Sequence, residues 1–153
     1  MSRDYALVFN LLQAESYNVL TDWLAFLPYP PKTMVAYFRG NAETRGMVED
    51  LAAKIGANLV VVPDELITDH RNQETKLVDW QFSQVKEPFC IRVNMDTIAY
   101  RTTKDDWLTP AFEQIERGEV LFATGSTQPF RADRPDADPG QMRTRRISFN
   151  FVA

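Results

Sequence analysis

The chain has 153 residues, of which 44% are hydrophobic and 25% are charged, and this balance excludes a disordered, collagen-like or coiled-coil protein. A formal net charge of −4 argues against a general nucleic-acid binder, which needs an excess of Lys and Arg. One cysteine cannot form an internal disulfide, no apolar run reaches the roughly 20 residues of a membrane span, and the start lacks a signal-peptide pattern. We therefore expect a cytoplasmic protein with one domain over residues 1–153.

Apolar runs without Gly or Pro predict strands that are buried on both faces of a sheet. They occupy residues 5–12, 33–38, 58–62, 89–93 and 120–123. A last run, residues 147–152, alternates apolar and polar side chains and predicts a half-exposed strand.

Apolar residues at helical spacing predict a helix after each of the first four strands. We expect the first helix to begin at a Ser16 cap, and the apolar stripes of the second and third to include Met47 and Phe82. Gly56 and Gly118 stand where helix C-caps favour positive φ. The fourth helix has alternative caps in Asp105, Asp106 and Thr109, and Thr109 would place Pro110 at the first helical position.

Strands and helices thus alternate four times before two final strands. This order predicts a three-layer α/β/α fold with a mainly parallel sheet and helices on both faces. Residues 128–145 are rich in Pro, Asp and Arg and are expected to form a long surface loop.

In such sheets, ligands bind beyond the carboxyl ends of the strands, where the strand order reverses. The polar segment Asn94-Met95-Asp96 follows the fourth strand. Residues two apart in an extended segment point the same way, so Asn94 and Asp96 can address one ligand. A carboxylate suits Mg²⁺ or Mn²⁺, whereas an amide suits a sugar hydroxyl. An ordinary strand-end turn uses the same residues, and spacing alone favours that interpretation.

Other polar residues admit both a functional and a structural interpretation. Arg39-Gly40-Asn41 opens the second helix, whose start can attract an anion, although Asn41 also suits an N-cap. Arg71 and Lys76 flank the third helix and suit either a diphosphate or solvent. His70 fits an ordinary exposed histidine, and Cys90 fits a buried, inert thiol. No GxGxxG or GxxxxGK[ST] pattern is present.

One arrangement is similar to a known family. Asn94-Met95-Asp96-Thr97 is followed by Asp106-Trp107-Leu108, a helix, and a strand that ends in Phe122-Ala123-Thr124-Gly125-Ser126. This order resembles the nucleotide-sugar-binding half of GT-A-type glycosyltransferases, above all the large inverting family. The element order of the whole chain shares the resemblance, and the motif likeness is confined to the fourth strand. It implies a GT-A, or nucleotide-diphospho-sugar transferase-like, fold.

The resemblance also implies roles for individual residues. Asp96 would bind a Mn²⁺ or Mg²⁺ ion that bridges the diphosphate of a UDP- or GDP-sugar, and Asn94 would contact the ribose. Asn94 departs from the family, which has a carboxylate there. Arg39 and Asn41 stand near the place where an aspartate commonly recognises the base. The expected nucleotide-sugar contacts are Gln13, Arg39, Asn41, Asn72, Lys76 and Asn94.

Three functions remain open from the sequence. The first is transfer of a sugar from a nucleotide-diphospho-sugar to an acceptor hydroxyl. The second is a non-catalytic interaction or assembly module, favoured by the short chain and the missing first carboxylate, with the strand at 147–152 as an edge that pairs with a second copy. The third is a phosphate-processing enzyme that uses Asp96 with Mg²⁺.

Overall fold

The computed structural model describes residues 3–39, 42–67, 73–95 and 106–118, and the backbone of three two-residue strands. Strands β1 (Tyr5–Leu11), β2 (Thr33–Phe38), β3 (Asn58–Val61) and β4 (Phe89–Asn94) are parallel. Strand β7 (Phe151–Val152) pairs with β4 in the antiparallel sense. The strand order is β3-β2-β1-β4-β7, and β5 (Arg134–Pro135) pairs separately with β6 (Met142–Arg143).

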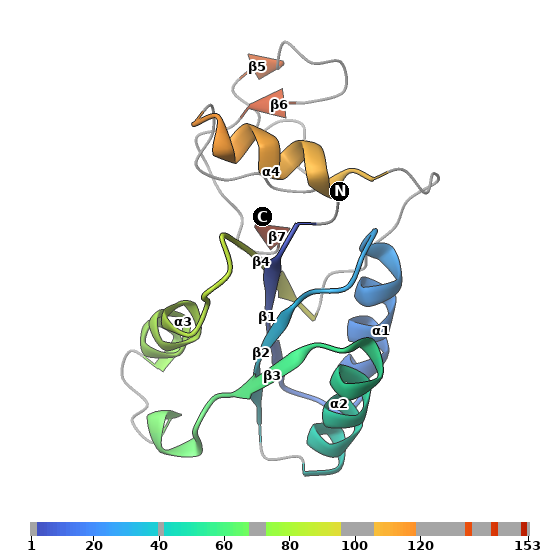
Figure 1. The fold of residues 1–153 in the computed structure, drawn as a ribbon. Coiled ribbons are helices and arrows are strands. Elements are labelled where there is room, and N and C mark those ends of the chain that lie inside the picture. Colours follow the sequence, from blue (N-terminus) through green and yellow to red (C-terminus); the bar gives the residue numbers. More distant parts are fainter. Residues whose placement is uncertain are drawn as a thin grey trace.

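Helices cover both faces of this sheet. Helices α1 (Ser16–Phe26) and α2 (Ala42–Ile55) lie on one side, and α3 (Gln73–Ser83) lies on the other (Figure 1). A 3-10 turn, η1 (Asp64–Ile67), follows β3. Helix α4 (Leu108–Glu116) lies beyond the amino end of β1 (Figure 1). The predicted three-layer α/β/α architecture with a mainly parallel sheet is therefore confirmed.

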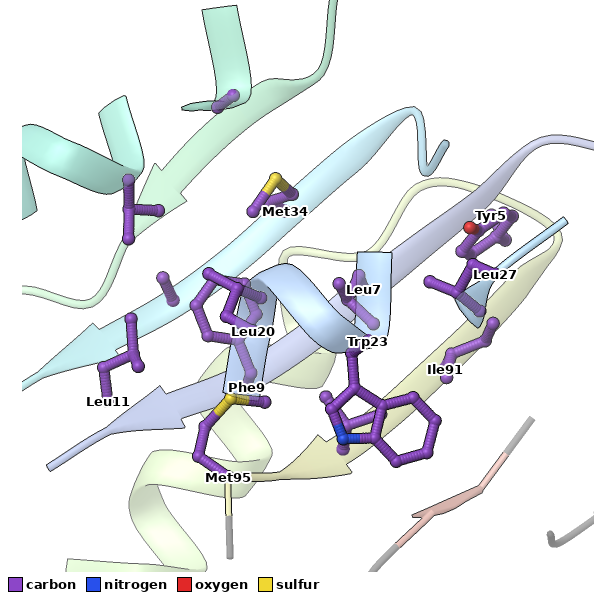
Figure 2. Close-up of a cluster of buried hydrophobic side chains, with 14 of the residues drawn as sticks. Tyr5, Leu7, Phe9, Leu11, Leu20, Trp23, Leu27, Met34, Ile91 and Met95 are labelled. Carbon is purple, nitrogen blue, oxygen red and sulfur yellow. The ribbon is translucent and has the colours of Figure 1, made fainter. Parts of the chain in front are cut away.

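The main core lies between the sheet and α1. Leu7, Phe9 and Leu11 alternate along β1 and point toward this helix, because successive side chains of a strand face opposite ways. Leu20 and Trp23 of α1 pack over them. Met95, just after β4, belongs to the same cluster and lies near Phe9 (Figure 2). The opposite side of β1 carries Ala6, Val8 and Asn10. Strand β1 is therefore covered on both faces, as its unbroken apolar run predicted.

The predicted burial of two apolar helix residues is wrong. Met47 in α2 is 41% exposed, because the face that packs inward carries Thr44, Val48 and Ala52. Phe82 in α3 is 40% exposed, and Gln81 is the buried residue beside it. Both errors have the same cause: the prediction assigned a large apolar side chain to the inner face, and the residue that is buried there is smaller or polar.

The strand predicted at residues 58–62 is present at 58–61, but the prediction that it is buried is wrong. Strand β3 is only partly buried, because it is the outer strand on the β2 side. The strand predicted at 120–123 lies outside the described residues. So does the surface loop predicted at 128–145, apart from the short strands β5 and β6.

The helix ends differ from the predicted caps at Ser16 and Thr109 and agree with them at Asp106, Gly56 and Gly118. Ser16 is the first residue of α1, and Glu15 holds the N-cap position without a side-chain hydrogen bond. Asp106 accepts hydrogen bonds from the backbone N–H groups of Leu108 and Thr109, at 3.2 and 3.0 Å. It also accepts one from the Thr109 hydroxyl at 2.7 Å, so Asp106 is the capping side chain, and Thr109 lies inside α4. Gly56 and Gly118 have φ of 73° and 69°, as predicted for helix ends.

Helix α4 packs against the amino ends of the strands. The ring of Phe112 stacks on Phe89, with centroids 4.1 Å apart, and lies 5.8 Å from Tyr5. Arg3 forms ion pairs with Glu113 and Glu116 on the same helix. Within the described part of the chain, no helix is long and apolar enough to cross a membrane.

Candidate functional site

The carboxyl ends of β1 and β4 lie where the strand order reverses. The chain passes from β1 outward through β2 to β3, and then returns to the other side of β1 as β4. Asn10 near the end of β1 is the register partner of Asn94, the last residue of β4. Ligands of open α/β sheets bind at such a reversal, because the loops beyond the two strands separate there. We refer to the ends of β1, β2 and β4 as the carboxyl edge.

A pair of carboxamides lies just below this edge, on the α3 side of the sheet. The Gln81 Nε2 group donates to the carbonyl oxygen of Phe9 at 3.2 Å and to Asn10 Oδ1 at 2.9 Å. Gln81 is fully buried, and its Oε1 has no hydrogen-bond partner among the described residues. Gln81 of α3 is thus hydrogen-bonded directly to the carboxyl end of β1, where the strand order reverses.

Sequence reasoning missed Gln81. The signal was present, because Gln81 follows the buried Leu77 by four residues and so shares its helix face. Because Phe82 is apolar, the predicted inward face of this helix included Phe82 in place of the adjacent Gln81. A glutamine on an inward helix face is itself informative, since buried polar groups need partners.

Two predicted contact residues occupy this edge. Gln13 is exposed two positions beyond β1, and its backbone oxygen accepts a hydrogen bond from the N–H of Ser16 at 3.2 Å. Arg39 is exposed directly after β2, and its backbone N–H donates to the Leu11 oxygen at 3.1 Å. That bond joins the ends of β1 and β2. The structure thus brings Gln13 and Arg39 to neighbouring strand ends, while their contact with a ligand stays a prediction.

The other predicted site residues are only partly described. Lys76 is exposed on α3, on the opposite side of the sheet from α1. The backbone of Asn94 completes β4, but its side chain lies outside the described part. Asn41, Asn72 and Asp96 lie wholly outside the described residues. Met95, the last described residue before Asp96, is buried (Figure 2).

The described groups at the carboxyl edge are carboxamides and a guanidinium. These groups suit phosphate oxygens, ribose hydroxyls and base carbonyls. They do not by themselves fit a divalent cation, which prefers carboxylate oxygens. Across the described ranges, no group of three or more His, Cys, Asp or Glu side chains could hold a metal ion. Asp96, the metal ligand expected from the sequence, lies outside these ranges, and a metal site stays a prediction.

Cys90 does not have the properties of a nucleophile. Burial, followed by the nearby Glu87 carboxylate, raises the pKa of its thiol to about 12, against a smaller opposing effect of Arg92. The reactive species is the thiolate, which is scarce at neutral pH when the pKa is this high. Cys90 is half-buried and not fully buried as expected, but its raised pKa agrees with the expectation of an inert thiol.

The sheet topology and the flanking helices define an α/β fold with a mainly parallel sheet. Nine chains of solved structures match this fold, among them residues 1–349 of TarS from S. aureus, a glycosyltransferase. The identity is 14% and the TM-score 0.61, and the match covers 97% of this chain but 46% of that one. No protein-family model and no curated protein matches. A likeness at this identity shows the fold alone, and the chain spans less than half the length of that structure.

Proposed function

We propose that this chain binds a nucleotide-diphospho-sugar at its carboxyl edge and belongs to an enzyme that transfers the sugar to an acceptor. The observation that carries the proposal is the polar carboxyl edge at the strand reversal, in a sheet whose fold is that of a glycosyltransferase. Gln13 follows β1 and Arg39 follows β2, and Asn10 lies near the end of β1 as the register partner of Asn94 in β4. Their chemistry suits an oxygen-rich anion.

In such a transfer, the acceptor oxygen bonds to the anomeric carbon while the bond from that carbon to the diphosphate oxygen breaks. The diphosphate leaves with the bonding electron pair, and a base takes the hydroxyl proton. We assign Arg39 to the diphosphate, because a guanidinium offers paired donors and a permanent positive charge. Gln13 and Asn10 are assigned to neutral oxygen atoms of the same ligand. The base is not assigned.

A Mn²⁺ or Mg²⁺ ion at Asp96, with Asn94 toward the ribose, is part of this proposal. It draws on the resemblance of Asn94-Met95-Asp96 to the family motif. Asn41, Asn72 and Lys76 are proposed as further contacts, on the resemblance to the same family. The metal at Asp96 is separable from nucleotide binding, and the experiment tests the two separately.

Thermal unfolding with UDP- and GDP-sugars, each with and without Mn²⁺, tests the proposal. A ligand at about 100 times its dissociation constant adds roughly 2.7 kcal/mol to the free energy of unfolding, which gives a clear rise in Tm. The variant Asp96→Ala should lose the Mn²⁺-dependent part of that rise. Asp50→Ala, an exposed position on α2, is the matched control and should behave as the wild type.

The outcomes separate the parts of the proposal. If no nucleotide sugar raises the Tm, donor binding is wrong. If the Tm rises equally with and without Mn²⁺, and Asp96→Ala changes nothing, only the metal assignment is wrong. Release of free UDP from a UDP-sugar, followed over hours by chromatography, then reports whether the bound donor is turned over.

One observation favours a second function. Asn94 stands where the resembled motif has a carboxylate, so the metal-binding charge is reduced. This would suit a glycosyltransferase-like module that binds a partner or a second copy instead of a donor. Sedimentation velocity over a hundredfold range of protein concentration tests this alternative. A concentration-dependent dimer, together with no thermal shift by nucleotide sugars, would favour it over donor binding.

A further inference from the structure

The buried carboxamide of Gln81 sets the orientation of the polar group at the end of β1. Its amino nitrogen lies 3.2 Å from the carbonyl oxygen of Phe9, which can only accept a hydrogen bond. The atom of Gln81 that faces Phe9 must therefore be Nε2 and not Oε1. Chemistry, and not only the placement of atoms, fixes which way this amide is turned.

The same reasoning then fixes Asn10. Gln81 Nε2 can only donate, so Asn10 has to present its Oδ1, and the two atoms are 2.9 Å apart. The Asn10 Nδ2 group, with two hydrogens, is consequently turned away from Gln81. Asn10 is half-buried at the penultimate position of β1 and so remains within reach of a ligand at the carboxyl edge.

This arrangement has a cost to stability. Gln81 is fully buried, yet its Oε1 has no hydrogen-bond partner among the described residues. A buried acceptor without a partner destabilises a fold. A leucine at this position would continue the apolar face begun by Leu77 without that cost. Unlike a leucine, the glutamine orients Asn10 through its hydrogen bond to Oδ1.

We propose that Gln81 is a positioning residue, which holds the Asn10 carboxamide so that Nδ2 donates a hydrogen bond to an acceptor oxygen of a nucleoside diphosphate at the carboxyl edge. The inference rests on the proposed function for the identity of the ligand. The orientation of Asn10 itself does not depend on it. A fixed donor at this point favours phosphate, hydroxyl or carbonyl oxygens and disfavours cationic ligands.

The test uses UDP as the probe and three variants of the whole chain. Gln81→Leu removes the hydrogen bonds that orient Asn10. Asn10→Asp keeps an acceptor for Gln81 but replaces the outward donor by a negatively charged oxygen. Gln84→Leu is the control, because it makes the same change one residue beyond the same helix, at an amide whose Nε2 donates to the Ser83 hydroxyl and to no atom of β1 among the described residues. Calorimetry gives the dissociation constant, and ¹H–¹⁵N spectra report the side-chain amide of Asn10.

We expect Asn10→Asp to weaken UDP binding at least tenfold while the Tm stays close to that of the wild type. Gln81→Leu should weaken it about fivefold to tenfold and move the Asn10 amide signals, and Gln84→Leu should do neither. A loss of one oriented hydrogen bond corresponds to changes of this size. Should the leucine variant not fold, Gln81→Met, of similar length and without polar hydrogens, replaces it.

Unchanged UDP affinity together with unmoved Asn10 signals in Gln81→Leu would overturn the proposal. A purely structural role would lower the Tm and leave the affinity of the folded protein as it was, which also contradicts it. If the wild type does not bind UDP, the proposed function fails, and the orienting role is then judged on the Asn10 amide signals alone.

Discussion

The ring of Phe112 lies on the ring of Phe89 in a nearly parallel stack, with 15° between the planes. Phe112 belongs to α4 and Phe89 opens β4, so this contact attaches the helix to the amino ends of the strands. The candidate site is at the opposite, carboxyl ends. We therefore expect variants of Phe112 to change stability without changing ligand binding at the proposed site.

Phe112→Ala tests that separation. Phe112 is fully buried, and the loss of a buried phenylalanine costs about 3–5 kcal/mol of unfolding free energy. Urea unfolding measures this loss, and Phe112→Leu should lose much less. UDP affinity of the folded fraction should match that of the wild type. A large fall in affinity with Phe112→Leu would show that α4 also shapes the carboxyl edge.

Asp106→Ala should destabilise α4 by about 1 kcal/mol, because Asp106 caps the helix. Desolvation raises the pKa of Asp106, but hydrogen bonds from the Thr109 hydroxyl and two backbone N–H groups outweigh it, so the pKa lies below 3.8. The charged carboxylate is thus favoured in the folded state. Its contribution is complete above the unfolded pKa and is lost as the pH falls through the lower folded value.

Urea unfolding of wild type and Asp106→Ala at several pH values checks both parts of this prediction. The difference in unfolding free energy should be largest near neutral pH and should narrow below about pH 4. A difference that is independent of pH would mean that capping does not require the charge.

Cys90 should make the fold sensitive to alkali. Its pKa is raised from 9.0 to about 12, first by burial, so the folded protein keeps the thiol proton where the unfolded chain has lost it. The unfolding free energy is unaffected below pH 9 and falls between pH 9 and pH 12, by at most about 1.4 kcal/mol per pH unit. Cys90→Ala should fall less steeply over this interval. Equal slopes for the two proteins in urea unfolding would contradict the prediction.

Arg39→Gln should weaken UDP binding about tenfold or more, because hydrogen bonds to charged groups contribute more than neutral ones. The Arg39 side chain is exposed and forms no hydrogen bond or ion pair with the described residues. The Tm without ligand should therefore not change. Lys54→Gln, at the far end of α2, removes the same charge and should leave the dissociation constant unaltered. Titrations at two salt concentrations should show that Arg39→Gln also reduces the salt dependence.

Most of the fold could be predicted, because the strands are short apolar runs and the helices end at recognisable residues. β2 spans the predicted residues, and β1 and β4 differ from prediction by one residue at one end. Burial was harder to predict where it depends on neighbours far along the chain. Nothing within residues 58–62 shows that β3 is an outer strand, since that follows from the strand order.

The candidate site could be predicted only at the level of strand ends. The reversal rule placed Gln13 and Arg39 at the correct edge, because both directly follow predicted strands. It could not find the Gln81–Asn10 pair, which joins residues 71 apart in the sequence. Polar partners on different elements are visible only after the helix has been docked on the sheet.

The central place of β1 has a consequence for local opening. This strand pairs with β2 on one side and β4 on the other, and its residues from Tyr5 to Val8 are wholly buried. Each of its backbone N–H groups faces β2 or β4, and its proton can reach solvent only when that neighbour separates and the helices that cover the sheet move away. In native-state hydrogen exchange they should accordingly be the slowest of the chain, with opening free energies that approach those of global unfolding, while those of β3 exchange earlier.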